Sequence, residues 1–411
     1  MEGTKPFTIS KEAVFEAYKR VKANKGTYGI DGQSIADFER DLENNLYKLW
    51  NRMASGTYFP QPVRAVAIPK KNGGTRTLGI PTVEDRIAQM AAKIYFEPCV
   101  EPLFYEDSYG YRPNKSMKQA LAVTRERCWK RDFVLEFDIK GLFDNIRHDY
   151  LMEMVKTHAK DRWIVLYIER WLQAPFQTQE GTIVERTSGT PQGGVISPVL
   201  ANLFLHYVFD DYMVKEFPTI PWARYADDAI AHCVSLKQAN FLLAKLHKRF
   251  SMYGLELHLE KTKIVYCKDG SRRGGHENTS FEFLGYTFRA RKAKDKHGRY
   301  FTSFLPAISA KAKNTIRNEV RSWRLQLKSD KNLQDIANMC NSKIRGWVNH
   351  YSHFYRSEMY AVLCYIDECL VKWTQKKYKK LNTKQKAAHW IRDIARRNPQ
   401  LFAHWKFFET M

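Results

Sequence analysis

Three aspartates have the clearest capacity for chemistry in this sequence. Asp138 ends the apolar run 133–138, where a charge is costly to bury unless something compensates it. Asp227 and Asp228 are adjacent and lie between two short apolar stretches. An isolated Asp-Asp pair is more often a solvated turn, but three carboxylates brought together form the oxygen site that Mg²⁺ prefers. Two ions held there can activate a hydroxyl and bridge phosphates.

Short β elements must position these acids. Residues 133–138 read as a strand, with Phe133, Leu135 and Phe137 on one face. One hairpin is expected over 64–80, with its turn at Lys71–Gly74, and a second around Tyr225-Ala226-Asp227-Asp228. Residues 11–23 read as a helix, because their apolar positions recur at intervals of three and four. The first half of the chain is therefore expected to mix strands with helices.

The composition indicates a polyanionic partner. The chain has 411 residues, a formal net charge of +23 and a pI near 9.6. Such a surplus points most simply to nucleic acid, and the alternative is a basic enzyme without a nucleic-acid ligand. Hydrophobic residues make up 44% of the chain, so a sizeable core can be buried in two or three domains.

Membrane, secreted and zinc-finger classes fit the sequence poorly. The first residues show no basic segment followed by an apolar one, and the longest apolar run, 195–209, is too short to span a bilayer. The seven cysteines are odd in number and form no CxxC pair, which argues against a disulfide framework and a zinc finger. We expect reduced cysteines, a cytoplasmic location and no membrane contact.

The last third of the chain differs in pattern and charge. Beyond Arg291 the apolar periodicity predicts helices, with aromatic stripes that suit a helical core. Residues 291–411 contain 26 Lys and Arg against 9 Asp and Glu, so they carry +17 of the net charge. This shift predicts a domain boundary near 290. A nucleic-acid groove is the preferred explanation of the basic excess, and a solvated face is the alternative.

An ordered series of motifs adds to this reading. The segments, in chain order, are Asn24–Gly32, Ile68-Pro69-Lys70, Arg76–Pro81, Asp85-Arg86, Ser108–Pro113, Asp138–Ile146, Thr190–Gly194 with Ser197-Pro198, Tyr225–Asp228, Gly254–Leu257, Lys261–Lys263, Phe283–Tyr286 and Ile344–Tyr351. Together they resemble the reverse transcriptases of bacterial group II introns, the intron-encoded reverse transcriptase/maturase family. The resemblance covers nearly the whole chain.

The resemblance implies an α+β multidomain fold, a right-hand polymerase. It assigns 1–60 to an N-terminal extension and 61–290 to fingers and palm, an antiparallel sheet packed on helices. It assigns 291–365 to an all-α thumb, the maturase domain X, and 366–411 to a short basic segment that is a possible DNA-binding region. The paired-cysteine endonuclease module found in many members does not occur in this sequence, so we expect no second-strand cleavage.

The resemblance also implies roles for individual residues. Asp138 and Asp227 would hold two Mg²⁺ ions, with Mn²⁺ able to substitute, and Asp228 would ligate or orient at the primer end. The backbone carbonyl of Ile139 would add a metal ligand. The residues expected to bind the dNTP are Lys70 and Arg76, which would clamp the triphosphate, Phe143, which would exclude a 2′-hydroxyl, and Gln192, which would contact the base or sugar.

Nucleic-acid contacts are expected at several further positions. Arg112 would contact the template or brace the fingers, and the residues alone do not choose between these. The segment 372–380 interleaves cations with aromatics, so it is either a DNA- or RNA-binding segment or an exposed basic helix face. The remaining positions implied by the motifs are Lys261, Lys263, Gly285, Arg345, Lys376 and Lys377.

The implied function is an RNA-directed DNA polymerase that also assists splicing of a group II intron RNA. Its partners would be an RNA template, a DNA primer, dNTPs and the intron RNA, with the oligomeric state open. One alternative is an RNA-binding maturase whose polymerase is vestigial; the intact acids argue against it. The other is a domesticated relative in phage defence, CRISPR spacer acquisition or DNA repair, with the same chemistry and a different partner.

Overall fold

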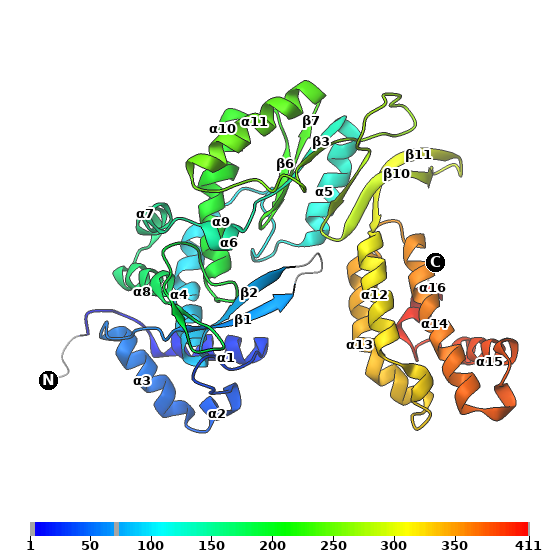
Figure 1. The fold of residues 1–411 in the computed structure, drawn as a ribbon, viewed down its shortest axis with the longest axis horizontal. Helices are drawn as coiled ribbons and strands as arrows, with labels where there is room; N and C mark the ends of the chain where they lie inside the picture. Colours follow the sequence, from blue (N-terminus) through cyan, green and yellow to red (C-terminus); the bar gives the residue numbers. More distant parts are fainter. Residues whose placement is uncertain (1–4, 70–73, 410–411) are drawn as a thin grey trace. The chain divides into compact units, whose positions relative to one another are not determined.

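The computed structural model describes residues 5–69 and 74–409, and the chain forms two compact units (Figure 1). Unit 1 comprises Met1–Ala120 and Leu135–Lys263, and unit 2 comprises Leu121–Val134 and Ile264–Met411. Helices and mainly antiparallel sheets are combined in one chain, which agrees with the expected α+β class. The domain limits at 60, 290 and 365 stay predictions.

Unit 1 begins with helices that pack on one another. Helix α1 (Lys11–Asn24) is the helix predicted over 11–23, and its apolar stripe is buried: Val14, Ala17, Tyr18 and Val21. Ser10 caps its first turn by accepting a hydrogen bond from the Ala13 amide. The helices that follow in this unit, up to residue 173, are α2 (Ile35–Glu39), α3 (Leu42–Ala54), α4 (Val83–Val100), η1 (Glu101–Leu103), α6 (Leu142–Asn145), α7 (His148–His158) and α8 (Arg162–Gln173).

The predicted hairpin over 64–80 is confirmed. Strands β1 (Val63–Pro69) and β2 (Thr75–Ile80) pair antiparallel, with Ile68 opposite Arg76. They belong to a four-stranded sheet with the order β2-β1-β4-β5, in which β4 (Phe176–Gln177) runs parallel to β1 and β5 (Ile183–Val184) ends the sheet. Residues 71–73 of the predicted turn lie outside the described part of the chain.

A second sheet carries the three aspartates. Its order is β6-β7-β3-β8, and it contains β3 (Phe133–Asp138), the strand that the sequence predicts. Strands β6 (Trp222–Tyr225) and β7 (Asp228–Cys233) form the second predicted hairpin, and β8 spans Lys263–Tyr266. The Phe137 ring packs on those of Phe209 and Phe250. The remaining helices of unit 1 are α9 (Ser197–Leu205), η2 (His206–Asp210), α10 (Asp211–Glu216) and α11 (Leu236–Met252), of which α11 contacts β7.

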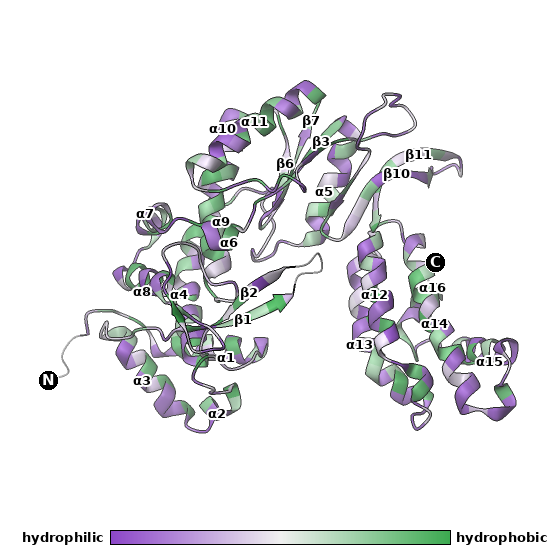
Figure 2. Cartoon of the chain, in the orientation of Figure 1, coloured by the Kyte–Doolittle hydropathy of each residue, from purple (hydrophilic) through white to green (hydrophobic). Residues whose placement is uncertain are grey.

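Unit 2 combines a β-sheet with a helical bundle. The sheet has the order β11-β10-β9, formed by β9 (Ser280–Phe283), β10 (Tyr286–Lys294) and β11 (Tyr300–Ile308). The bundle buries an apolar core that includes Ile344, Leu370 and Trp373, while hydrophilic residues dominate α12 in Figure 2. Its helices are α12 (Ala310–Ser322), η3 (Leu325–Leu327), α13 (Leu333–Tyr351), α14 (Ser357–Lys377), η4 (Lys379–Leu381), α15 (Lys384–Arg397) and α16 (Ala403–Glu409).

The expectation that the chain is all helical from residue 291 is wrong for residues 291–308. The long hairpin β10–β11 runs through this region, with Arg291 opposite Ser303. Aromatic and β-branched residues in 300–308 favour a strand. Gly298, at φ +84°, supplies the left-handed conformation that the connecting turn needs. From Ala310 onward the helical expectation is confirmed.

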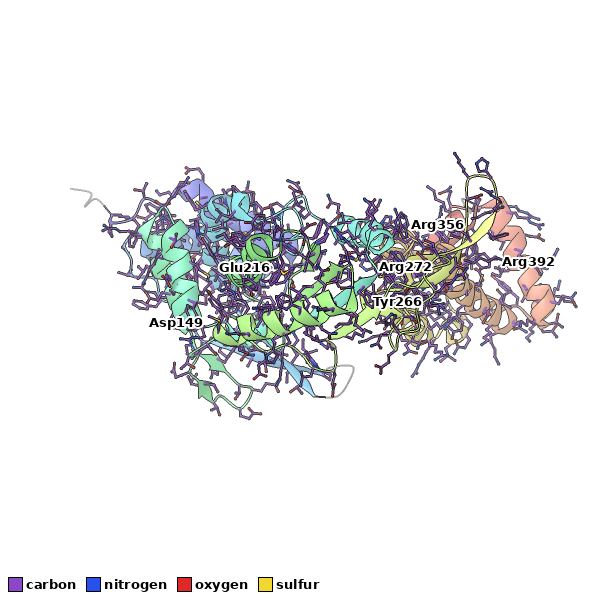
Figure 3. All side chains as sticks on the ribbon, turned by 90° about the horizontal axis from the view of Figure 1, so that it is seen from above. Asp149, Glu216, Tyr266, Arg272, Arg356 and Arg392 are labelled. Carbon is purple, nitrogen blue, oxygen red and sulfur yellow. The ribbon has the colours of Figure 1, made fainter. Side chains whose placement is uncertain are left out.

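Arg272 fixes the segment 121–134 within unit 2, and it is among the side chains labelled in Figure 3. Its guanidinium donates to the carbonyl oxygens of Cys128, Trp129 and Cys267 and pairs with Asp132 at 2.8 Å. Helix α5 (Met117–Lys130), which begins in unit 1, supplies two of these carbonyls. No helix in the described residues is both long enough and apolar enough to cross a membrane.

Candidate active site

The three aspartates belong to unit 1 and lie at adjoining positions of one sheet. Asp138 is the last residue of β3, and Asp227 and Asp228 form the turn and first residue of the β6–β7 hairpin. Strands β7 and β3 are neighbours in the sheet, so the turn and the end of β3 meet. Ile139, the proposed backbone ligand, follows directly and pairs with Leu257. The sheet therefore brings together all four predicted metal positions.

The charges of these carboxylates oppose one another. Burial, and then the charges of Asp227 and Asp138, raise the pKa of the Asp228 carboxyl to about 7, although the residue retains exposed surface. Burial, and then the charge of Asp138, also raise the pKa of Asp227. Asp227 and Asp228 thus resist ionisation because they are buried and because other carboxylates lie close to them. The arrangement costs free energy unless a cation joins it.

Lys261 supplies the positive charge found at this site. Its ammonium group donates to Asp138 Oδ2. Burial lowers the pKa of Lys261, but the hydrogen bond to Asp138 and the charges of the three acids outweigh this and raise it. Across residues 5–69 and 74–409, no three His, Cys, Asp or Glu side chains form an assembled metal-ligand group. The oxygen donors and their mutual repulsion nevertheless suit a divalent cation, which would replace Lys261 as the neutralising charge.

A buried polar network holds the Asp-Asp turn in place. The guanidinium of Arg224 is fully buried and forms two bonds with the carboxylate of Asp210, with Nε to Oδ1 at 2.7 Å. It also donates to the Asn202 side chain at 2.9 Å and to the Ala226 carbonyl oxygen at 3.2 Å. Ala226 adopts the left-handed conformation, at φ +57°. Arg224 therefore fixes the residue that directly precedes Asp227.

Gly110 allows the backbone of the turn to approach closely. A Cβ at this position would lie 2.4 Å from the Ala226 amide nitrogen, closer than any real Cβ contact. The Gly110 carbonyl oxygen accepts a hydrogen bond from Asn202 Nδ2 at 2.7 Å. A larger residue would displace the turn that carries Asp227.

The predicted nucleotide-binding residues are only partly brought together. Arg76 on β2 donates through Nε to Gln192 Oε1, and Gln192 Nε2 lies 3.1 Å from Asp144 Oδ2. The Gly79 amide donates to the Gln192 carbonyl oxygen at 2.9 Å, which holds the two segments together. Phe143, next to Asp144, is half-buried. Lys70 lies outside the described residues.

The other predicted contacts in unit 1 are engaged within the protein. Arg112 donates to Glu101 Oε1 at 2.9 Å and to two carbonyl oxygens of the segment 105–108. Lys263 pairs with Glu136 at 3.3 Å. These contacts fit the bracing alternative for Arg112, while nucleic-acid binding by Lys261 and Lys263 stays a prediction.

The predicted positions in unit 2 lie on several elements of its surface. Gly285, at φ +80°, follows β9 and lies against the Tyr351 ring, and Arg345 is exposed on α13. Lys377 donates to the Ser329 carbonyl oxygen at 3.0 Å. Lys376 lines a cavity of about 540 Å³ in this unit, together with cations from α12 and α14: Arg321 and Lys372.

Sequence reasoning missed the buried partners of the site. No role is predicted from the sequence for Asp210, Asp144, Arg186 or Arg224. The available signal was weak: Asp210 directly follows the apolar run 195–209, where a charge needs a buried partner. The identity of that partner depends on tertiary structure.

Two family models match parts of this chain. Residues 68–288 match the family model described as "Reverse transcriptase (RNA-dependent DNA polymerase)". Residues 313–391 match the model described as "Group II intron, maturase-specific domain". The first match contains all three aspartates of the site.

Curated relatives come from bacteria and a fungus. The group II intron-encoded protein LtrA of Lactococcus lactis subsp. cremoris is 36% identical over 203 residues, 49% of this chain and 33% of LtrA. Protein YkfC of Escherichia coli is 30% identical over 306 residues, 64% of this chain and 80% of YkfC. A 91 kDa protein in the cob intron of Schizosaccharomyces pombe is 26% identical over 439 aligned positions, 90% of this chain and 53% of that protein. The matched part thus spans about a third of LtrA.

Proposed function

Because this chain belongs to the reverse transcriptase family, we propose that it copies RNA into DNA and also assists the splicing of a group II intron RNA. The observation that carries the proposal is the group of three mutually repelling carboxylates at the ends of β3 and the β6–β7 turn. A site that binds no cation has no need to keep such a group. The maturase-specific match supports the second activity.

Asp138, Asp227 and Asp228 would hold two Mg²⁺ ions, with Mn²⁺ able to substitute, and the Ile139 carbonyl would contribute a ligand. The bound ions would supply positive charge that activates the primer 3′-hydroxyl and stabilises the transferring phosphoryl group. The protein contributes the fixed placement of these carboxylates. Arg224 and Gly110 keep the turn rigid, so little reorganisation is needed when the substrate arrives.

Lys261 prepares Asp138 for this role. Its ammonium group donates a hydrogen bond to the Asp138 carboxylate and so holds that side chain in place. With a divalent cation held by Asp138, the Lys261 ammonium group would no longer be needed to neutralise the carboxylate and could bind a nucleic-acid phosphate. This exchange reconciles the ion pair with the predicted nucleic-acid contact.

Arg76, Lys70, Gln192 and Phe143 would bind the dNTP. The guanidinium of Arg76 would leave Gln192 and bind the triphosphate, and Gln192 would then contact the base or sugar. The Phe143 ring would lie under the sugar and exclude a 2′-hydroxyl. The two residues Arg76 and Gln192 already lie within hydrogen-bond distance of each other.

The two compact units suit different parts of the task. In the proposed right-hand arrangement, β1–β2 belongs to the fingers, the β6-β7-β3-β8 sheet to the palm and the α12–α14 bundle to the thumb. The basic surface of the bundle would follow the backbone of an RNA–DNA hybrid or of an intron RNA, because phosphate contacts do not depend on sequence.

Primer extension on poly(rA)/oligo(dT) with Mg²⁺ and dTTP tests the polymerase. We expect the wild type to extend the primer and Asp227→Ala to lose extension while retaining RNA binding. Asp161→Ala is a matched control, because Asp161 precedes α8 without forming a side-chain cap. Extension by Asp227→Ala would refute the site assignment. A folded wild type that fails to extend would favour the maturase-only alternative, and splicing of the neighbouring RNA would become the assay.

A further inference from the structure

Arg186 is a buried cation without a hydrogen-bond partner. Its residue is 9% exposed, and none of its three guanidinium nitrogens has a partner among the described residues. The guanidinium stacks on the Phe176 ring, 4.1 Å from its centroid. Burial lowers the pKa of Arg186 to about 10, so it stays charged at neutral pH. A buried, unpaired charge is costly, so this position calls for an anionic partner in some state of the protein.

Asp144 is the anion next to Arg186. Its charge favours the charged form of Arg186 and raises the pKa that burial lowers, yet the two side chains do not form an ion pair. The carboxylate is instead bonded to Gln192 Nε2, at 3.1 and 3.2 Å from its two oxygens. His148 is the other titratable neighbour, but burial and the charge of Arg186 lower its pKa, and Nε2 is engaged with the Gly189 carbonyl oxygen. A neutral imidazole offers no negative charge.

The backbone beside these two residues is firmly held. Ser188 Oγ donates to the Asp144 carbonyl oxygen at 3.0 Å, and the Gly189 amide donates to the Ile146 carbonyl oxygen at 2.7 Å. A Cβ on Gly189 would lie 2.8 Å from the Asp144 Cα, so the two segments are as close as glycine allows. Asp144 can therefore approach Arg186 only by rotation of its side chain.

Arg76, Gln192 and Asp144 form a chain of hydrogen bonds that ends one step from Arg186. We propose that Asp144 changes partner, from Gln192 to Arg186, when an incoming dNTP engages Gln192 and Arg76. Arg186 is then a positioning residue: by capturing Asp144 it frees the Gln192 amide for the nucleotide. This inference rests on the proposed polymerase function and describes how the side chains of its nucleotide site would rearrange when a dNTP binds.

Two substitutions and their combination test the exchange. Arg186→Met removes the charge and keeps an apolar stem on Phe176, and Asp144→Asn keeps an oxygen that can accept from Gln192. The dissociation constant of dTTP is measured on poly(rA)/oligo(dT) with a dideoxy-terminated primer, and the melting temperature is measured on the free protein. Glu185→Gln is the matched control, an exposed charge adjacent to Arg186.

We expect each single substitution to raise the dTTP dissociation constant roughly tenfold, the size of a charged hydrogen bond. The double variant should match the singles rather than multiply them, because both act on one contact. The melting temperature of free Arg186→Met should be unchanged or higher, since an unpaired buried charge has been removed. A purely structural role predicts the opposite: a lower melting temperature with unchanged dTTP binding.

Three outcomes would overturn the inference. Normal dTTP binding by Arg186→Met in an active enzyme would refute the role proposed for Arg186, but it would not contradict the proposed polymerase function. Effects that multiply to about 100-fold in the double variant would show two independent contacts. If the wild type neither binds dTTP nor extends a primer, both the proposed function and this inference are refuted. Because Asp144 is exposed, its variant tests the exchange even if Arg186→Met fails to fold.

Discussion

Asp210→Asn should destabilise unit 1 more than any substitution at a surface carboxylate. Asp210 and Arg224 are both fully buried, and two hydrogen bonds join the carboxylate to the guanidinium. Asparagine keeps the shape and one acceptor oxygen, but it removes the negative charge and turns a donor toward the arginine. Arg224 then remains charged, buried and only partly paired.

The cost can be worked from this geometry. Breaking a buried ion pair by removing one charge costs about 3–5 kcal/mol. Unit 1 contains about 250 residues, and in a domain of this size each kcal/mol shifts the melting temperature by about 2–4 °C. The midpoint of the unit 1 transition should therefore fall by roughly 10 °C. Differential scanning calorimetry on the whole chain resolves the transition.

Asp211→Asn is the matched control. Asp211 is the next residue, is partly exposed and pairs with Lys215 at 2.7 Å. A pair of this kind contributes about 1 kcal/mol or less, so its loss should shift the midpoint by at most roughly 4 °C. Equal, small shifts for Asp210→Asn and Asp211→Asn would refute the reasoning that the buried pair holds the unit together.

Four further predictions concern selectivity, pH, packing and salt. Phe143→Ala should lower the dNTP/rNTP preference roughly tenfold or more in single-nucleotide incorporation, and an unchanged ratio would remove the steric role. Burial raises the pKa of Asp85 to about 6, so its contribution to stability is present below the unfolded pKa of about 4 and is lost as pH rises through 6. Asp85→Asn should therefore lessen the loss of unfolding free energy between pH 4.5 and 7.5 by about 2 kcal/mol in urea titrations, whereas the exposed Asp41→Asn should leave it unchanged. Gly110→Ala should slow primer extension about 100-fold by displacing Ala226, with RNA binding retained; normal extension would contradict the close approach. RNA affinity should fall about 1,000-fold between 50 and 200 mM salt in filter binding, and a flat response would argue against a phosphate-binding surface.

Elements set by local patterns were predicted from sequence. The strand 133–138 is a short apolar run ended by a charge, and the hairpin over 64–80 has turn residues between two β-rich segments. Helix α1 follows the spacing of its apolar residues. Such features depend on neighbours within a few positions, which a sequence displays directly.

Features that depend on distant residues were not predictable in the same way. Asp138 and Lys261 are 123 positions apart, and nothing near either residue identifies the other as its partner. The strands within 291–308 were not predicted, because the many Lys and Arg residues in 291–299 interrupt the alternation of apolar and polar residues that indicates a strand. In each case tertiary contacts, rather than local preference, decide the structure.

The buried arginines Arg224 and Arg186 of unit 1 differ in whether their charge is paired, and this difference distinguishes a structural role from a role in nucleotide binding. Arg224 has a carboxylate, an amide oxygen and a backbone carbonyl to bind, so its charge is compensated and its position is fixed. Arg186 is almost as buried and binds none of these, although Asp144 is close enough to influence its pKa. A compensated charge stabilises one arrangement, whereas an uncompensated charge favours a second arrangement in which it is paired. Arg224 therefore belongs to the scaffold that carries the Asp-Asp turn, and Arg186 belongs to the step in which the nucleotide is received.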